Sequence, residues 1–173
     1  MKFRKIAFAA PLFSALLLAS ACGGADEPAV EADSEAVNAV MPNGMTVKEL
    51  AHHRHEQYEK VGDAFKAMGD QLKSDSPDMA IIQTSAASVS TAIEGIDGWF
   101  PEGSGPETGV DTDALPAIWE NKADFDQKTA DFKASVAELV TATESGDVAV
   151  IGAAMKAAGG TCKACHDKYR EDD

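Results

Sequence analysis

The sequence predicts an all-α protein, an antiparallel four-helix bundle. Aromatic residues make up only 6% of the 173 residues, alanine is abundant and β-branched residues are few, a composition that favours helices over sheet. Beyond residue 45, apolar residues recur at steps of three and four in four segments of roughly 20 to 30 residues each. The connections between these segments are mostly short, which places consecutive helices side by side in opposite directions.

Residues 1–21 are typical of a secretory signal. Three basic residues lie among the first five, an apolar run follows over 6–18, and Ala-Ser-Ala precedes Cys22. The segment is too short for a permanent transmembrane helix. Its end resembles a bacterial lipobox, in which the cysteine is lipidated, although the same residues also fit an ordinary signal peptidase site. We favour a lipoprotein, periplasmic and anchored at the membrane, because a lone cysteine there is otherwise unexplained.

Residues 22–45 are predicted to form a flexible acidic tether. They are rich in Ala, Glu, Asp, Gly and Pro and contain no aromatic residue. Such a segment buries too little apolar surface to offset the entropy lost on ordering it. The folded domain is therefore expected over residues 46–173.

The first helix of the bundle is expected to begin at a capping box, with Thr46 as the N-cap and Glu49 as the third helical residue. It should continue to about Ser74. The second helix is expected to take Ser76 as its N-cap, with a proline at the first helical position, and to end near Gly98.

Residues 101–113 are rich in Gly and Pro and form the longest break in the domain. A third helix is expected after Pro116, ending at residues 145–146, and Asp147 is a suitable N-cap for the fourth. The face of this last helix is predicted to carry apolar and chemically reactive residues together: Ile151, Met155, Ala158, Cys162, His166 and Tyr169.

The last helix contains the motif Cys-x-x-Cys-His, formed by Cys162, Cys165 and His166. This motif attaches c-type haem. The two thiols add to the two vinyl groups of one porphyrin and become thioethers, and the imidazole is held where it can bind the iron from one face. On a helix, Cys162 and His166 lie one turn apart on the same side. The sequence therefore predicts one covalently bound haem near the C-terminus.

A cysteine pair can also be structural, redox-active or half of a zinc site. A thioredoxin-like site needs a βαβ setting, and a zinc site needs two further Cys or His residues at ligand spacing. Neither is present. The only other cysteine, Cys22, belongs to the export signal, so none remains for a disulfide. Export agrees with haem attachment, because bacterial c-type haem is attached outside the cytoplasm.

The formal net charge of −14 limits the class of partner. Nucleic acid is not expected, because binding to a phosphate backbone requires a basic patch. An acidic surface permits a basic redox partner protein, and it is equally the surface of an ordinary soluble domain.

Taken together, these features make the chain similar to the cytochromes c′, four-helix bundle proteins with haem attached near the C-terminus. The resemblance covers residues 46–170 and rests on several stretches in order. These are Arg54, Tyr58 and Phe65–Met68 in the first helix, Trp99–Ser104 in the following turn, Leu115–Glu120, Ser145–Asp147, and Cys162–Arg170.

The resemblance implies roles for individual residues. His166 would be the axial ligand, and Tyr58 would pack over the opposite face of the iron as a lid rather than a ligand, since a phenol with a pKa near 10 ligates iron only when strongly activated. Arg170 would lie beside the imidazole, or else simply complement the helix dipole. Arg54 would pair with a haem propionate, or be a surface or interface residue. Phe65 would pack against the haem or the core.

Three histidines in the first helix, His52, His53 and His55, are interpreted as surface residues. His55 lies one turn before Tyr58, at the mouth of the expected haem site. A metal site from His52 and His55 lacks a third ligand. Met68 is ten residues beyond Tyr58, about 15 Å along a helix, and is a poor sixth ligand.

The function expected from the resemblance is that of a non-enzymatic haem protein. A five-coordinate, high-spin iron would bind a diatomic gas such as NO or CO and exchange electrons. The alternative is a low-spin electron-transfer cytochrome of the c556 type, which would need a methionine where Tyr58 stands. A peroxidase would need a distal acid–base histidine, and His55 is the only candidate. A homodimer formed through the first two helices is also expected.

Overall fold

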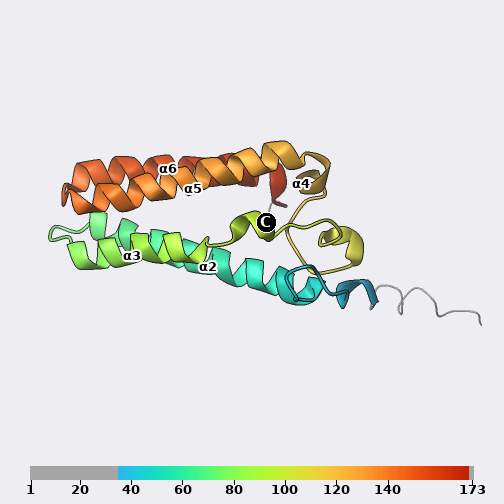
Figure 1. The fold of residues 1–173 in the computed structure, drawn as a ribbon. Helices are drawn as coiled ribbons and strands as arrows, with labels where there is room; N and C mark the ends of the chain where they lie inside the picture. The colour runs from blue at the N-terminus through green and yellow to red at the C-terminus, as the bar shows by residue number, and fades with distance from the viewer. Residues whose placement is uncertain (1–34, 172–173) are drawn as a thin grey trace, which may run out of the picture.

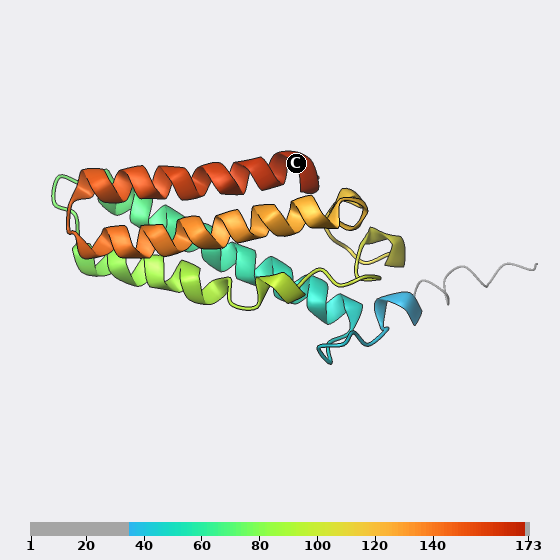
Figure 2. The same cartoon turned by 45° about the horizontal axis from the view of Figure 1, so that its top comes forward.

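The computed structural model describes residues 35–171. Four long helices, α2 (Val47–Leu72), α3 (Met79–Ala92), α5 (Lys122–Glu144) and α6 (Val148–Tyr169), lie alongside one another with alternating direction (Figures 1 and 2). The predicted antiparallel four-helix bundle is confirmed. The predicted export signal, Cys22 and the first part of the predicted tether lie outside the described residues.

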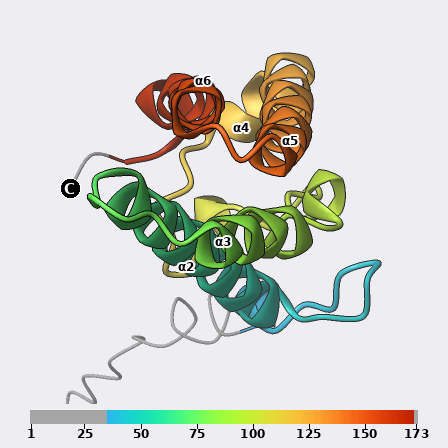
Figure 3. The same ribbon diagram turned by 90° about the vertical axis from the view of Figure 1, so that its left-hand side faces the viewer.

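The bundle consists of two helix pairs, α2 with α3 and α5 with α6, packed face to face (Figure 3). Between the pairs lies a continuous apolar core to which all four helices contribute. Its fully buried side chains include Met68, Ile82, Val89, Val136, Leu139 and Ile151. Among the helices of residues 35–171, none combines the length and apolar character needed to cross a bilayer.

The predicted capping box begins α2. The Glu49 N–H donates to Thr46 Oγ1 (3.2 Å), and Thr46 N–H donates to Glu49 Oε2 (2.8 Å). Residues 35–45, which the composition assigns to the tether, are hydrogen-bonded to this end of the helix. The N–H of Val47 donates to the carbonyl of Ala39 (3.0 Å), and Val40 forms an antiparallel bridge with Thr46.

The second helix, α3, differs from the sequence prediction at both ends. Its N-cap is Asp78 rather than Ser76, because the Asp78 carboxylate accepts from two free N–H groups, those of Ala80 (2.9 Å) and Ile81 (3.3 Å). The helix stops at Ala92 instead of near Gly98. Gly95 has φ +76°, a conformation that ends a helix at low cost only for glycine, and a 3-10 turn, η1 (Ile96–Gly98), follows.

The predicted third helix is divided in two. A short helix, α4 (Ala117–Glu120), is separated from α5 by Asn121, whose φ of −124° and ψ of 43° are not helical. Asparagine tolerates such a conformation better than most residues, so a break at this position is cheap. The start of α4 is held by the Trp119 indole N–H, which donates to the Pro101 carbonyl (2.8 Å). Asp147 caps α6 as predicted, accepting from the N–H groups of Ala149 and Val150.

The long connection between η1 and α4, which includes the 3-10 turn η2 (Pro106–Thr108), is fixed to α2 by a buried arginine. The side chain of Arg54 is only 3% exposed. Its guanidinium donates to the carbonyls of Trp99 (3.2 Å) and Ser104 (3.0 Å) and to Ser104 Oγ (3.3 Å), and it lies 4.7 Å from the centre of the Phe100 ring. Arg54 therefore holds both ends of the 99–104 turn.

Replacing Arg54 with methionine should lower the free energy of unfolding by about 2–3 kcal/mol, because the buried oxygens of Trp99 and Ser104 lose a charged donor. Arg54→Lys should recover little of this loss, since one ammonium group cannot span the three acceptors. Urea denaturation measures the change. Lys48→Met, at an exposed position of the same helix, is the control and should change stability by no more than about 0.5 kcal/mol. Equal stability of Arg54→Met and the wild type would contradict this role.

Candidate functional site

The Cys-x-x-Cys-His motif lies near the C-terminal end of α6. Cys162 and Cys165 are free, half-buried, and packed against the apolar core. Burial raises the pKa of the Cys162 thiol to about 11. Burial also raises the pKa of the Cys165 thiol. A redox-active cysteine pair has a lowered pKa, so these neutral thiols do not have the properties of a thioredoxin-like site.

The imidazole of His166 is more open to solvent than the two thiols. Partial burial lowers its pKa, and the positive charge of Arg170, one turn further along, lowers the pKa again. Both effects favour the neutral imidazole at neutral pH. The neutral form is the one that can bind a metal ion.

Tyr58 of α2 lies within electrostatic reach of the motif on the other helix pair. Its side chain is 36% exposed, yet desolvation by the surrounding protein raises the pKa of the phenol above its usual range, and the thiol of Cys165 raises it further. The phenol is therefore close to the cysteines of α6.

Other residues of α2 leave room for a flat apolar group next to Tyr58. One turn after Tyr58, a Cβ added to Gly62 would meet nothing within 4 Å. Phe65, one further turn along, is half-buried and packs against the edge of the core. Two thiols and an imidazole on α6, and an aromatic and open surface on α2, are the donor set and the space that a covalently attached haem requires.

The position of Tyr58 depends on the turn that Arg54 holds. The Tyr58 ring meets the Trp99 ring edge to face, with centroids 5.6 Å apart, and Trp99 is almost fully buried. His53 meets the same indole from another side, at 5.3 Å. The sequence prediction of a surface position for His53 is therefore only partly right, because it is half-buried against Trp99.

Arg54 lies close to this site, but its side chain is buried beneath the surface. Its hydrogen bonds go to neutral oxygens, and among residues 35–171 no carboxylate forms an ion pair with it. Burial lowers the pKa of Arg54 to about 10, so the group remains charged at neutral pH. The guanidinium is thus a buried positive charge with no ion pair among residues 35–171, although the carboxylate of Glu107 is near enough to raise its pKa.

The end of α6 is fixed to α5 by Tyr169, which is 2% exposed. Its hydroxyl donates to Asp124 Oδ2 (2.5 Å), which also accepts from the Lys168 ammonium (2.8 Å). The Tyr169 ring packs on Phe125 at 5.2 Å, and Phe125 packs on Phe100 at 4.9 Å. This chain of aromatic rings connects the haem-motif helix to the turn held by Arg54.

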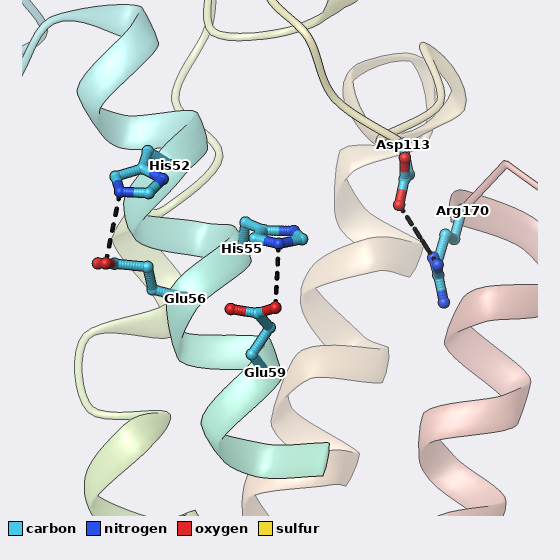
Figure 4. A network of polar contacts seen from close by, with 6 residues as sticks. All are labelled: His52, His55, Glu56, Glu59, Asp113 and Arg170. Atoms are coloured by element: carbon cyan, nitrogen blue, oxygen red, sulfur yellow. Dashed lines mark hydrogen bonds and ion pairs between the residues drawn. The ribbon is translucent and has the colours of Figure 1, made fainter. Parts of the chain in front are cut away.

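Arg170 follows as the C-cap of α6 and pairs with Asp113 (Figure 4). The same figure shows His52 with Glu56 and His55 with Glu59, each at 3.4 Å along one exposed side of α2. Within residues 35–171, no group of three His, Cys, Asp or Glu residues is placed to hold a metal ion. His52 and His55 are surface residues, as the sequence predicts.

Three residues of the site were missed by the sequence reading. Asp113 and Asp124 are 57 and 44 residues from the side chains they contact, and nothing in their local sequence distinguishes them from other surface acids. Ser104 belongs to the predicted turn, but its bond to Arg54 connects positions 50 residues apart. Contacts at such separations have no local signal.

A family model described as Cytochrome C' matches residues 49–170 of this chain. The chain belongs to the cytochrome c′ family. Like other cytochromes c′, it carries a covalently bound c-type haem, and its two attachment cysteines lie in the C-terminal helix. The family assignment agrees with the donor set described above.

Relatives and solved structures support the assignment. A cytochrome c' of Rhodospirillum rubrum is 33% identical over 121 residues, which cover 69% of this chain and 80% of that protein. A cytochrome c-554 of Cereibacter sphaeroides is 31% identical over 129 residues, covering 73% and 96%. The structure of a nitric oxide complex of a mutant cytochrome c prime from Alcaligenes xylosoxidans superposes with a TM-score of 0.66 at 28% identity, covering 73% and 97%.

The contacts of Asp124 predict a specific response to acid. Hydrogen bonds from Lys168 and Tyr169 lower the pKa of this carboxyl in the folded protein. Its contribution to stability is therefore present above the unfolded-state pKa, near about 4, and is lost as the pH falls through the lower folded-state pKa. Asp124→Asn should be less stable than the wild type at pH 7, and the difference should shrink as the pH falls below about 4.

Urea denaturation at a series of pH values measures this difference. Asp131→Asn is a suitable control on the same helix, because that carboxylate accepts from Gln127 rather than from a cation. A constant difference between Asp124→Asn and the wild type across the acid range would show that the carboxylate charge is not what holds Tyr169 and Lys168.

Proposed function

We propose that this cytochrome c′ holds a five-coordinate, high-spin haem iron that binds a diatomic gas such as NO or CO and exchanges electrons. His166 is the axial ligand, and Cys162 and Cys165 carry the thioether bonds. The observation that supports the proposal is that the Tyr58 phenol of α2 lies within electrostatic reach of the motif cysteines, on the helix where the resemblance implies the lid over the iron. When bound, the haem supplies an iron that changes oxidation state and takes a small ligand.

Tyr58 acts in this proposal as a lid. Desolvation raises the pKa of the phenol, so it stays protonated at neutral pH and is a poor iron ligand. The ring would exclude water and bulky anions from the face of the iron opposite His166. Trp99 supports the ring from behind, so that only a small uncharged gas would fit beside it.

The other predicted site residues have supporting roles. Phe65 packs against the haem from the same side of α2 as Tyr58. Arg170 stands beside His166. Arg54 would offer its positive charge to a haem propionate, in addition to the bonds with which it holds the 99–104 turn.

A low-spin electron-transfer cytochrome of the c556 type is less well supported. It would need a methionine on α2 facing the iron, and Met68 has no exposed surface because it is packed in the core beside Ile82 and Val89. A peroxidase is likewise not favoured. His55 is paired with Glu59 on the exposed side of α2, and no acid–base histidine is seen next to Tyr58 in the described part of the helix.

Outside the haem site, we propose that the protein is exported to the periplasm, is anchored through a lipid on Cys22, and forms a homodimer through α2 and α3. The lipobox-like end of the signal supports the anchor, and the resemblance of the first helices to those of cytochromes c′ supports the dimer. Mass spectrometry of the N-terminal peptide and sedimentation of the purified protein test the two points separately.

Absorption and EPR spectra of the purified holoprotein test the proposed coordination. The ferric form should be high spin at neutral pH, and NO or CO should shift the spectrum of the ferrous form. His166→Ala should keep both thioethers but lose the wild-type high-spin signal. A low-spin spectrum that does not change with gas would favour the c556 alternative.

Replacing Tyr58 with alanine should raise the affinity of the ferrous protein for CO. Moving a packed aromatic ring out of apolar surroundings costs on the order of 1–3 kcal/mol, which corresponds to roughly a 10- to 100-fold change in affinity. CO titration measures it, and Tyr58→Phe separates the ring from the hydroxyl. An unchanged CO affinity in Tyr58→Ala would mean that the ring is not a lid.

A further inference from the structure

The C-terminal end of α6 is joined to the segment 113–115 by an antiparallel bridge of the main chain. The N–H of Leu115 donates to the carbonyl of Tyr169 (3.0 Å), and the N–H of Glu171 donates to the carbonyl of Asp113 (2.8 Å). These bonds do not depend on side chains. They fix the backbones of Asp113 and Arg170 next to each other at the base of the haem-motif helix.

The side chains of the two residues continue this contact. Arg170 donates from Nε (3.4 Å) and Nη2 (3.3 Å) to the same oxygen, Oδ2, of Asp113 (Figure 4). At its other end, the N–H of Arg170 donates to the carbonyl of His166 (3.1 Å). The main chain of Arg170 is therefore bonded one helical turn back to the proposed axial ligand, and its guanidinium forms an ion pair with Asp113.

The pair is not a strong contributor to stability. The side chains of Arg170 and Asp113 are 42% and 59% exposed, and exposed ion pairs contribute little to folding. The free energy that such a pair contributes is small mainly because its two side chains lose entropy when they are held together. Here the main-chain bridge already holds both residues next to each other. The carboxylate therefore orients the guanidinium with little further loss of side-chain entropy.

We infer that Asp113 is a positioning residue, which holds the Arg170 guanidinium beside His166 and balances its charge. The inference rests on the proposed ligation of the iron by His166. Arg170 is the residue one turn beyond His166 at the end of α6, so its charge lies close to the proposed ligand along the chain. Asp113 reaches the haem site only through Arg170.

This role has a measurable electrostatic consequence. With Asp113 present, the charges of the carboxylate and the guanidinium largely cancel when seen from the iron. Without the carboxylate, the positive charge of Arg170 is balanced less, and it favours the reduced iron, which carries one positive charge fewer. Removing the carboxylate should therefore raise the midpoint potential of the haem, and salt should screen the effect.

The experiment is a spectroelectrochemical titration of the Asp113→Asn holoprotein at low and high ionic strength. We expect an upward shift of the midpoint potential at low salt that decreases at high salt. Asp113→Glu should restore most of the wild-type value. Asp70→Asn removes the carboxylate of another exposed ion pair, with Lys66 (2.8 Å), and should leave the potential unchanged.

A double-mutant cycle with Arg170→Gln decides whether Asp113 acts through the arginine. In the Arg170→Gln background, adding Asp113→Asn should shift the potential much less than it does in the wild type. An equal shift in both backgrounds would mean that the carboxylate acts by its own charge, and would overturn the inference. So would an unchanged potential in Asp113→Asn.

Failure of the inference and failure of the proposed function give different results. If the wild-type ferric protein is high spin, loses this signal in His166→Ala, and yet Asp113→Asn keeps the wild-type potential, only the role of Asp113 is wrong. If the wild type is not high spin, or keeps its signal in His166→Ala, the proposed coordination itself is wrong. The side chains of aspartate and asparagine are nearly identical in shape, and position 113 is exposed, so the Asp113→Asn variant should fold normally.

Discussion

The buried guanidinium of Arg54 is the interaction on which the architecture around the haem depends. A charged group with so little exposure is tolerated only when its donors are satisfied, and the carbonyls of Trp99 and Ser104 satisfy them. If the turn from 99 to 104 moved away from α2, the buried guanidinium of Arg54 would lose its hydrogen-bond acceptors. Because a surface loop has few contacts of its own, this single requirement gives the turn its fixed position.

Both faces of the haem site take their geometry from that turn. On one side Trp99 supports the ring of Tyr58. On the other side Phe100 packs on Phe125, Phe125 packs on Tyr169, and Tyr169 is held by Asp124, so that the end of α6 is fixed to the same cluster. The loop then continues to residues 113–115, which pair with the last residues of α6. The opposite walls of the site are thus parts of one connected structure.

The sequence was informative wherever the signal is local. The Cys162–His166 motif, the capping box at Thr46 and the N-cap at Asp147 each depend on residues within five positions of one another, and the capping box and the N-cap are confirmed in the structure. The start of α3 was misplaced because Ser76 and Asp78 are both good N-caps, and the choice depends on which side chain reaches two N–H groups. The break at Asn121 was missed because its neighbours follow a helical pattern.

Two of the site residues could be only partly predicted, for a related reason. The charge of Arg54 was assigned to a propionate from the family resemblance, but its burial and its bonds to the 99–104 turn depend on a loop far along the chain. Arg170 was placed beside His166 by helix periodicity, whereas its partner Asp113 is brought there by the return of the loop. Long-range pairing is decided by the whole fold, so a single sequence does not reveal it.

The half-buried, protonated thiols of α6 also bear on the order of events in maturation. In the folded bundle Cys162 and Cys165 face the core, and burial disfavours the thiolate that reacts with a vinyl group. The same thiols on an undocked helix would be exposed and more reactive. The reactive thiolate is therefore more accessible before the α5–α6 pair packs onto α2 and α3 than after it. Folding and cofactor insertion are in this way parts of one assembly process.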